Sequence, residues 1–171
     1  EQDYQIRLPR WVQVDFARRV QAVADREARE LRGDEVWDIF RATYKKHGTP
    51  VELQKFWPRP HQHDPDQIDA EVHVGLHGRD HVLRADGNGP ISAFVHAVKQ
   101  LDGVPDFRLL DYDEGTRGHS ADAEGICFIR IAHDESNQGH IGVGIGSNID
   151  QAAARAVVAA LNAMLEAEAT T

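Results

Sequence analysis

The sequence predicts an α+β fold in which an N-terminal helical subdomain precedes two βββα units. Three observations lead to this prediction. Residues 1–48 carry apolar side chains at helical spacing, residues from 51 onward alternate as strands do, and the order of three strands and one helix occurs twice. We therefore expect a helical linker subdomain at 1–48 and a two-unit domain at 51–171, with units at about 51–103 and 104–171.

Two helices account for residues 1–48. Pro9 is suited to open the first helix. Gly33 is expected to stop this helix, and Asp34 is expected to be the N-cap of the second helix. Their apolar stripes are Val12, Phe16, Val20, Val23 and Ala24, and then Val36, Trp37, Ile39, Phe40 and Tyr44. Cations at 45–47 and Gly48 are typical of a helix C-terminus. Such a hairpin is too small to hold a core alone, so it needs a further surface.

Three strands and a helix are expected in each unit. In the first unit they are 51–57, 68–74, 81–85 and the helix 91–101, and in the second 107–112, 125–132, 141–145 and a helix from about 149. Strand 125–132 is apolar on both faces, so the other unit or a partner subunit should cover its second side. Cys127 in this strand is expected to be a buried thiol, and a lone cysteine excludes an internal disulfide.

A glycine-rich segment at 86–91 joins a strand to a helix and is suited to hold a small anion. Gly87 and Gly89 are expected to adopt positive φ, and Pro90 suits the first helical position. The N–H groups of the helix would then face a carboxylate or phosphate. The alternative is a turn that only connects the two elements. A second glycine-rich loop is expected at 142–148.

The composition excludes several classes of partner. Nineteen Lys and Arg against 28 Asp and Glu give a net charge of −9, which repels nucleic acid and anionic lipid. No apolar run approaches the length of a membrane span, and no signal peptide is present. We therefore expect a cytoplasmic protein that binds neither nucleic acid nor membranes.

Other polar clusters are weaker candidates. The loop residues His61, His63, Asp64 and Asp66 have metal-binding side chains, but their spacing matches no standard zinc or calcium site. His73 and His81 are at best neighbours across two strands. A free-standing hydrolase would have to use His119, Ser120 and Asp122, although no nucleophile elbow accompanies them.

Four stretches together resemble the C-terminal part of the 2-isopropylmalate synthase family. They are residues 8–16, 87–90 with 93–97, 110–112, and 142–145 with 156–162. The resemblance implies a linker subdomain followed by a leucine-binding regulatory domain that dimerises. It also implies that the catalytic barrel, with its divalent metal and its sites for acetyl-CoA and 2-oxoisovalerate, lies upstream. This chain itself would then hold no cofactor and would not catalyse.

The resemblance further implies an effector pocket. Its residues would be Gly87, Asn88, Gly89, Pro90, Ile91, Ser92, Leu109, Asp111, Tyr112, Thr116, Ala123 and Gly125. In that pocket, helix N–H groups would hold the leucine carboxylate, backbone carbonyls or Asp111 the ammonium, and Ile91, Leu109 and Ala123 the side chain. Tyr112 is equally consistent with a core aromatic residue.

Two alternatives of the same class stay open. The chain departs from the usual family pattern at 114–119 and at Gly146 and Ser147. It can therefore also be the regulatory domain of a citramalate synthase, which answers to isoleucine or leucine, or a dimerisation module without ligand.

Overall fold

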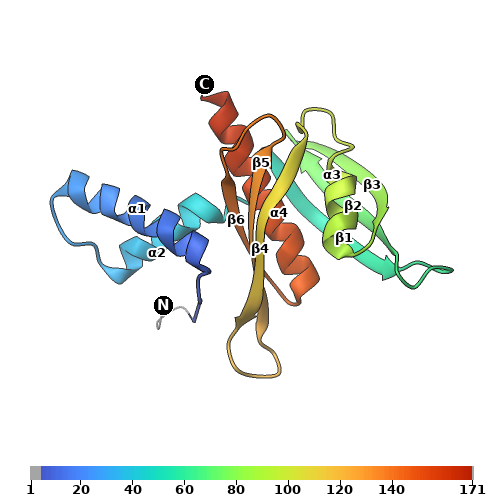
Figure 1. The fold of residues 1–171 in the computed structure, drawn as a ribbon, viewed down its shortest axis with the longest axis horizontal. Helices are drawn as coiled ribbons and strands as arrows, with labels where there is room; N and C mark the ends of the chain where they lie inside the picture. Colours follow the sequence, from blue (N-terminus) through green and yellow to red (C-terminus); the bar gives the residue numbers. More distant parts are fainter. Residues whose placement is uncertain (1–4, 171) are drawn as a thin grey trace.

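The computed structural model describes residues 5–170, and its order of elements confirms the α+β fold with a repeated βββα unit (Figure 1). The elements are α1 (Arg10–Glu27), α2 (Gly33–Tyr44), β1 (Val51–Pro60), β2 (Ile68–Leu76), β3 (Arg79–Gly87), α3 (Pro90–Val98), β4 (Phe107–Arg117), β5 (Glu124–His133), β6 (His140–Gly146) and α4 (Ile149–Ala169). The limits of the linker subdomain and of the two units as separate domains stay a prediction.

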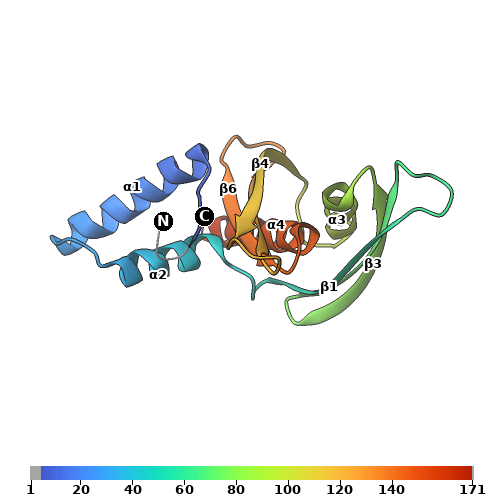
Figure 2. The same ribbon diagram turned by 90° about the horizontal axis from the view of Figure 1, so that it is seen from below.

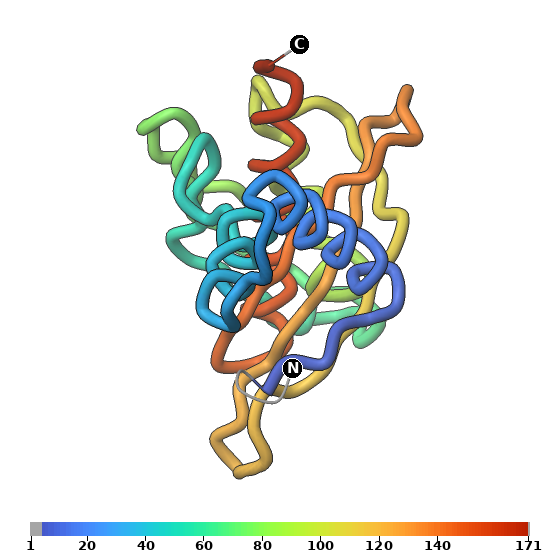
Figure 3. Tube along the Cα trace, turned by 90° about the vertical axis from the view of Figure 1, so that its left-hand side faces the viewer, coloured from blue at the N-terminus to red at the C-terminus, as the bar shows by residue number. Residues whose placement is uncertain are grey.

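The elements stack in four layers (Figure 2). The hairpin of α1 and α2 lies against the sheet β4-β5-β6, the helices α3 and α4 form the next layer, and the sheet β1-β2-β3 lies beyond them. Figure 3 looks onto the hairpin, which stands in front of the strands of the second sheet. The main core lies between the two sheets, around α3 and α4.

The repeat extends to the register of the strands. Both sheets are antiparallel, with neighbouring strands adjacent in sequence. A bulge interrupts the pairing of β1 between Leu53 and Lys55, and a bulge interrupts β4 between Leu109 and Asp111. Each bulge begins at the third residue of its strand, so Leu53 corresponds to Leu109 and Phe56 to Tyr112.

The second face of β5 is covered by the helical hairpin. Cys127, Ile129 and Ile131 point into the main core, whereas Ile126 and Phe128 join a second core with residues of α1 and α2. The expectation that the other unit or a partner subunit covers this face was therefore wrong. An apolar sheet face and an apolar helical hairpin must both be buried, and here the two surfaces bury each other.

Several element ends differ from the sequence prediction. The helix α1 ends before Ala28, which adopts left-handed φ of 52°, and not at Gly33. Arg32, not Asp34, occupies the N-cap of α2, where its N–H donates to Glu35 at 2.8 Å. Lys45 rather than Gly48 follows the last turn of α2. The first strand of each sheet is longer than expected, since β1 runs to Pro60 and β4 runs to Arg117.

Within residues 5–170, no helix is both long enough and apolar enough to span a membrane.

Candidate functional site

The glycine segment at 87–92 forms the junction between β3 and α3. Pro90 occupies the first helical position and Gly89 the N-cap, as expected, and no side chain caps this helix end. The N–H of Ala93 donates to Gly89 O at 3.0 Å. The earlier N–H groups of the first turn, those of Ile91 and Ser92, therefore have no partner within the helix and suit a small anion.

The two glycines serve different purposes, and neither has positive φ. Gly89 is extended, with φ −171° and ψ 172°, and a Cβ there would meet no atom within 4 Å. A Cβ on Gly87 would lie 2.6 Å from both Ala93 N and Ser92 Oγ. Gly87 is thus required because the first turn of α3 packs against the strand end. Gly89 leaves open space in front of the helix, and the expected left-handed backbone was wrong at both positions.

The second glycine-rich segment is mainly a strand and not a loop. Gly142, Gly144 and Gly146 lie in β6, whose inner face packs closely on α4. A Cβ on Gly142 would lie 2.1 Å from Ala156 O, and one on Gly144 would lie 2.0 Å from Ala152 O. These glycines therefore allow close helix-to-strand packing. Asn148 caps α4 with its side chain, which accepts from Gln151 N at 3.0 Å.

Three of the expected pocket residues gather at the N-terminus of α4. Thr116, Ala123 and Gly125 line a cavity of about 370 Å³ together with Glu114, Gly115, Asn148 and Ile149. A Cβ on Gly125 would lie 2.8 Å from Asn148 C. Sequence reasoning missed Glu114, Asn148 and Ile149 as parts of this cavity. The signal was present, because Asn148-Ile149 occupies the same place before α4 as Gly89-Pro90 before α3.

The strand β4 presents its expected site residues on two faces. Leu109 and Tyr112 lie opposite Ile131 and Ile129, on the face toward the helices, yet their exposed fractions are 37% and 41%. Asp111 lies on the other face, where Arg130 Nε donates to Asp111 Oδ2 at 2.6 Å. This ion pair makes Asp111 unsuited to hold a ligand ammonium in the pocket.

Tyr112 is a surface residue and not a core aromatic. Its hydroxyl donates to the carboxylate of Glu114. Burial of the hydroxyl and this hydrogen bond raise the pKa of Tyr112. The phenol therefore stays neutral and serves as a hydrogen-bond donor.

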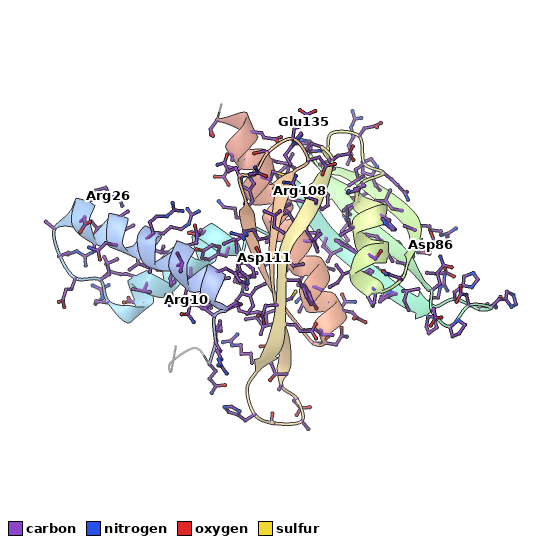
Figure 4. All side chains as sticks on the ribbon, viewed as in Figure 1. Arg10, Arg26, Asp86, Arg108, Asp111 and Glu135 are labelled. Atoms are coloured by element: carbon purple, nitrogen blue, oxygen red, sulfur yellow. The ribbon has the colours of Figure 1, made fainter. Side chains whose placement is uncertain are left out.

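The expected pocket residues do not form one cavity within a single copy. Residues 87–92 belong to the first unit, and 109–125 belong to the second. Figure 4 shows Asp86, which precedes the first segment, and Asp111 of β4 on opposite sides of α3. The cavity at α4 contains no residue of 87–92.

The other polar clusters are turn and surface features. In the loop after β1, Asp66 N donates to Asp64 Oδ1 at 3.0 Å, which is typical of a turn. Among residues 5–170, no group of three or more His, Cys, Asp or Glu side chains is arranged to hold a metal ion. His73 lies opposite Val82 while His81 lies opposite Val74, so the two histidines face opposite sides of the sheet and are not cross-strand neighbours.

The residues proposed for a hydrolase are exposed in the hairpin between β4 and β5. His119, Ser120 and Asp122 all lie on the surface. Ser120 takes part in the turn through its carbonyl, which accepts from Ala123 N at 3.1 Å. A hydrolytic site needs a base that is oriented by a third group, and a surface turn does not hold one.

The comparisons with known proteins agree with this architecture. The family described as LeuA allosteric (dimerisation) domain matches residues 30–165. Relatives named 2-isopropylmalate synthase include those of Rhodospirillum rubrum, 35% identical over 95% of this chain, and Thermobifida fusca, 38% identical over 95% of it. The relative from Acetoanaerobium sticklandii is 30% identical over 99% of the chain. The chain spans 29%, 27% and 30% of these relatives, less than a third of their length.

Proposed function

Because the chain belongs to the LeuA allosteric (dimerisation) domain family, we propose that it binds leucine and regulates a 2-isopropylmalate synthase as part of a homodimer. The catalytic domain would lie in the part of the relatives that this chain does not span. End-product feedback would place the domain beside a biosynthetic enzyme in the cytoplasm, and this location is part of the proposal.

The observation that carries the proposal is the uncapped N-terminus of α3. Its first-turn N–H groups and its dipole favour a carboxylate, and Gly89 leaves the approach open. The leucine carboxylate would bind there. The leucine side chain then needs an apolar wall. Of the residues expected to form it, only Ile91 lies at this helix end, whereas Leu109 and Ala123 belong to the second unit.

The two units differ in how β1 and β4 are covered. Phe56 of β1 is buried and packs on Phe94 of α3, with ring centroids 5.0 Å apart. Tyr112, its counterpart in β4, is 41% exposed, and Leu109 beside it is 37% exposed. This difference supports a second copy covering β4. With the 87–92 segment of one copy against Leu109 and Tyr112 of the other, each ligand site would be completed by two chains.

Calorimetric titration with leucine, isoleucine and valine tests the ligand. We expect saturable leucine binding. At a free leucine concentration of 100 times the dissociation constant, binding should stabilise the fold by about 2.7 kcal/mol. Preference for isoleucine would favour the regulatory domain of a citramalate synthase. Absence of binding by all three in a dimeric protein would leave a dimerisation module without ligand.

The variant Gly89→Val distinguishes a ligand site from a connecting turn. Since Gly89 is extended and has open space around it, valine should leave the fold intact and fill the space before α3. Leucine binding should then be lost. Gly33→Val is a matched control, because a Cβ at Gly33 also meets no atom within 4 Å. Unchanged leucine affinity in folded Gly89→Val would refute the assignment.

Light scattering tests the dimer. The expected mass is twice the 19.1 kDa of one chain. Leu109→Glu should give monomers, because a charge cannot be buried unpaired in an interface. Val82→Glu, at a residue 60% exposed on the outer face of the first sheet, should leave the mass unchanged. A monomer mass for the unmodified chain at tens of micromolar would rule out this arrangement.

A further inference from the structure

Three basic side chains meet around a cavity that the leucine proposal does not use. The cavity has a volume of about 300 Å³ and lies where the chain after α2, β1, β6 and α4 come together. Its lining consists of Lys45, His47, Leu53, Ile145, Arg155 and Val158. No residue of 87–92 or of β4 takes part, so it is distinct from the proposed leucine site.

Neither Lys45 nor Arg155 forms an ion pair with a carboxylate among residues 5–170. Lys45 is half-buried, and its ammonium lies 6.0 Å from the ring centroid of Trp37. Arg155, at the exposed rim, donates from Nη1 to Ile145 O at 2.5 Å, which leaves further guanidinium N–H groups for a ligand. Unpaired cations are unexpected in a protein of net charge −9.

His47 supplies a buried polar atom without a partner. Its Nδ1 is buried and makes no hydrogen bond. Burial, followed by the charges of Lys45 and Arg155, lowers the pKa of His47 to about 4. A buried polar atom without a partner is costly, and an anion that attracts a proton to the ring would satisfy it.

The charges around the cavity favour an anion further. Arg117, Arg41 and Arg155 lower the pKa of Lys45 after burial, and the opposing charge is Glu124. Glu124 already forms an ion pair with Arg117 at 3.6 Å. The local potential is therefore positive although the chain as a whole is acidic.

We propose that this cavity binds a small free oxyanion, phosphate-like or dicarboxylate, held by Lys45, His47 and Arg155. The anion would connect the helical hairpin with the βββα units, since Lys45 and His47 directly follow the hairpin and Arg155 belongs to α4, the last helix of the units. Its binding would fix the hairpin relative to the two sheets.

Calorimetric titration of the 171-residue chain with inorganic phosphate, and separately with malonate, tests the proposal. Ionic strength is held constant with sodium chloride so that general screening does not contribute. Saturable binding of either anion at one site per chain is expected. Lys45→Met and Arg155→Gln should each weaken it about tenfold, as expected for loss of one charge-assisted contact. Binding of neither anion would overturn the proposal.

As matched controls, two variants each remove one basic side chain elsewhere on the surface. Lys55→Met and Arg84→Gln, both in the first sheet, should leave the affinity unchanged. Equal weakening in these variants and in the cavity variants would show general charge attraction and would overturn the site. The unmodified chain gives a second readout by NMR. Phosphate should raise the pKa of His47 from about 4 toward its ordinary 6.5, and an unchanged His47 titration would also contradict the proposal.

Discussion

The side-chain amide of Asn162 pairs with both backbone groups of Val51. Val51 N–H donates to Asn162 Oδ1 at 2.8 Å, and Asn162 Nδ2 donates to Val51 O at 2.8 Å and to Lys46 O at 2.6 Å. Asn162 is 1% exposed, so no water competes for these bonds. The last helix therefore holds the connection between the helical hairpin and the first strand.

Replacing Asn162 should destabilise the whole chain. Asn162→Ala leaves one backbone N–H and two carbonyls without their partner, which we expect to lower the free energy of unfolding by about 3 kcal/mol. Asn162→Asp keeps the acceptor but places a carboxylate against two carbonyls, so it should be at least as harmful. Urea unfolding measures both. Midpoints equal to that of the unmodified chain would mean that the amide does not hold the connection.

Close packing of β6 on α4 makes Gly144 sensitive to any side chain. An added Cβ lies 2.0 Å from Ala152 O and 2.5 Å from Ala156 N, and both are backbone atoms that cannot move aside alone. We expect Gly144→Ala to cost about 3 kcal/mol or more. Gly89→Ala, which meets no atom within 4 Å, should stay within about 0.5 kcal/mol. Similar melting temperatures for the two variants would contradict this account.

The strands and their order were predictable because alternation of apolar residues reports directly on a half-buried sheet. The glycines of β6 were misjudged because glycine serves both turns and close packing. Ala152, Ala156 and Ala160 on α4 were the signal that distinguishes the two, since small residues on a helix allow a strand to approach. The end of α1 was missed because Ala28 adopts a left-handed conformation that glycine normally supplies.

The candidate site was less predictable than the fold. The order of motifs along the chain places Gly89 and Tyr112 in one family pattern, but it does not say whether they meet within one copy. The cavity at Lys45 and His47 was missed for a related reason. Lys45 and His47 are far from Arg155 in the sequence, and only the packing of α4 beside the chain after α2 brings the three side chains together.

Cys127 should be unreactive in the native protein. Its side chain is fully buried, and burial together with the charge of Glu114 raises the thiol pKa to about 12. Since the thiolate is the nucleophile, a disulfide reagent at pH 8 should modify the folded chain at least about a hundredfold more slowly than the urea-unfolded chain. Equal rates would place Cys127 at the surface.

Protonation of His47 should weaken the fold in acid. Its folded pKa of about 4 lies below the ordinary 6.5, so the unfolded chain binds the proton more tightly. Stability is therefore complete above about pH 6.5 and falls as the pH decreases toward 4. Solvent screening of this partly buried ring reduces the effect, and we expect a loss of about 1–2 kcal/mol over that range.

Urea unfolding at pH 7, 6, 5 and 4.5 in phosphate-free buffer measures this loss, because a bound anion would oppose it. His140, whose pKa burial also lowers, contributes in the same direction, so His47→Gln should reduce the slope without abolishing it. His63→Gln, at an exposed loop position, is the matched control and should keep the full slope. If His47→Gln loses stability with acid as steeply as the unmodified chain, the imidazole of His47 is protonated as easily in the folded protein as in the unfolded one. The lowered pKa of His47 that we expect in the anion-free chain would then be wrong.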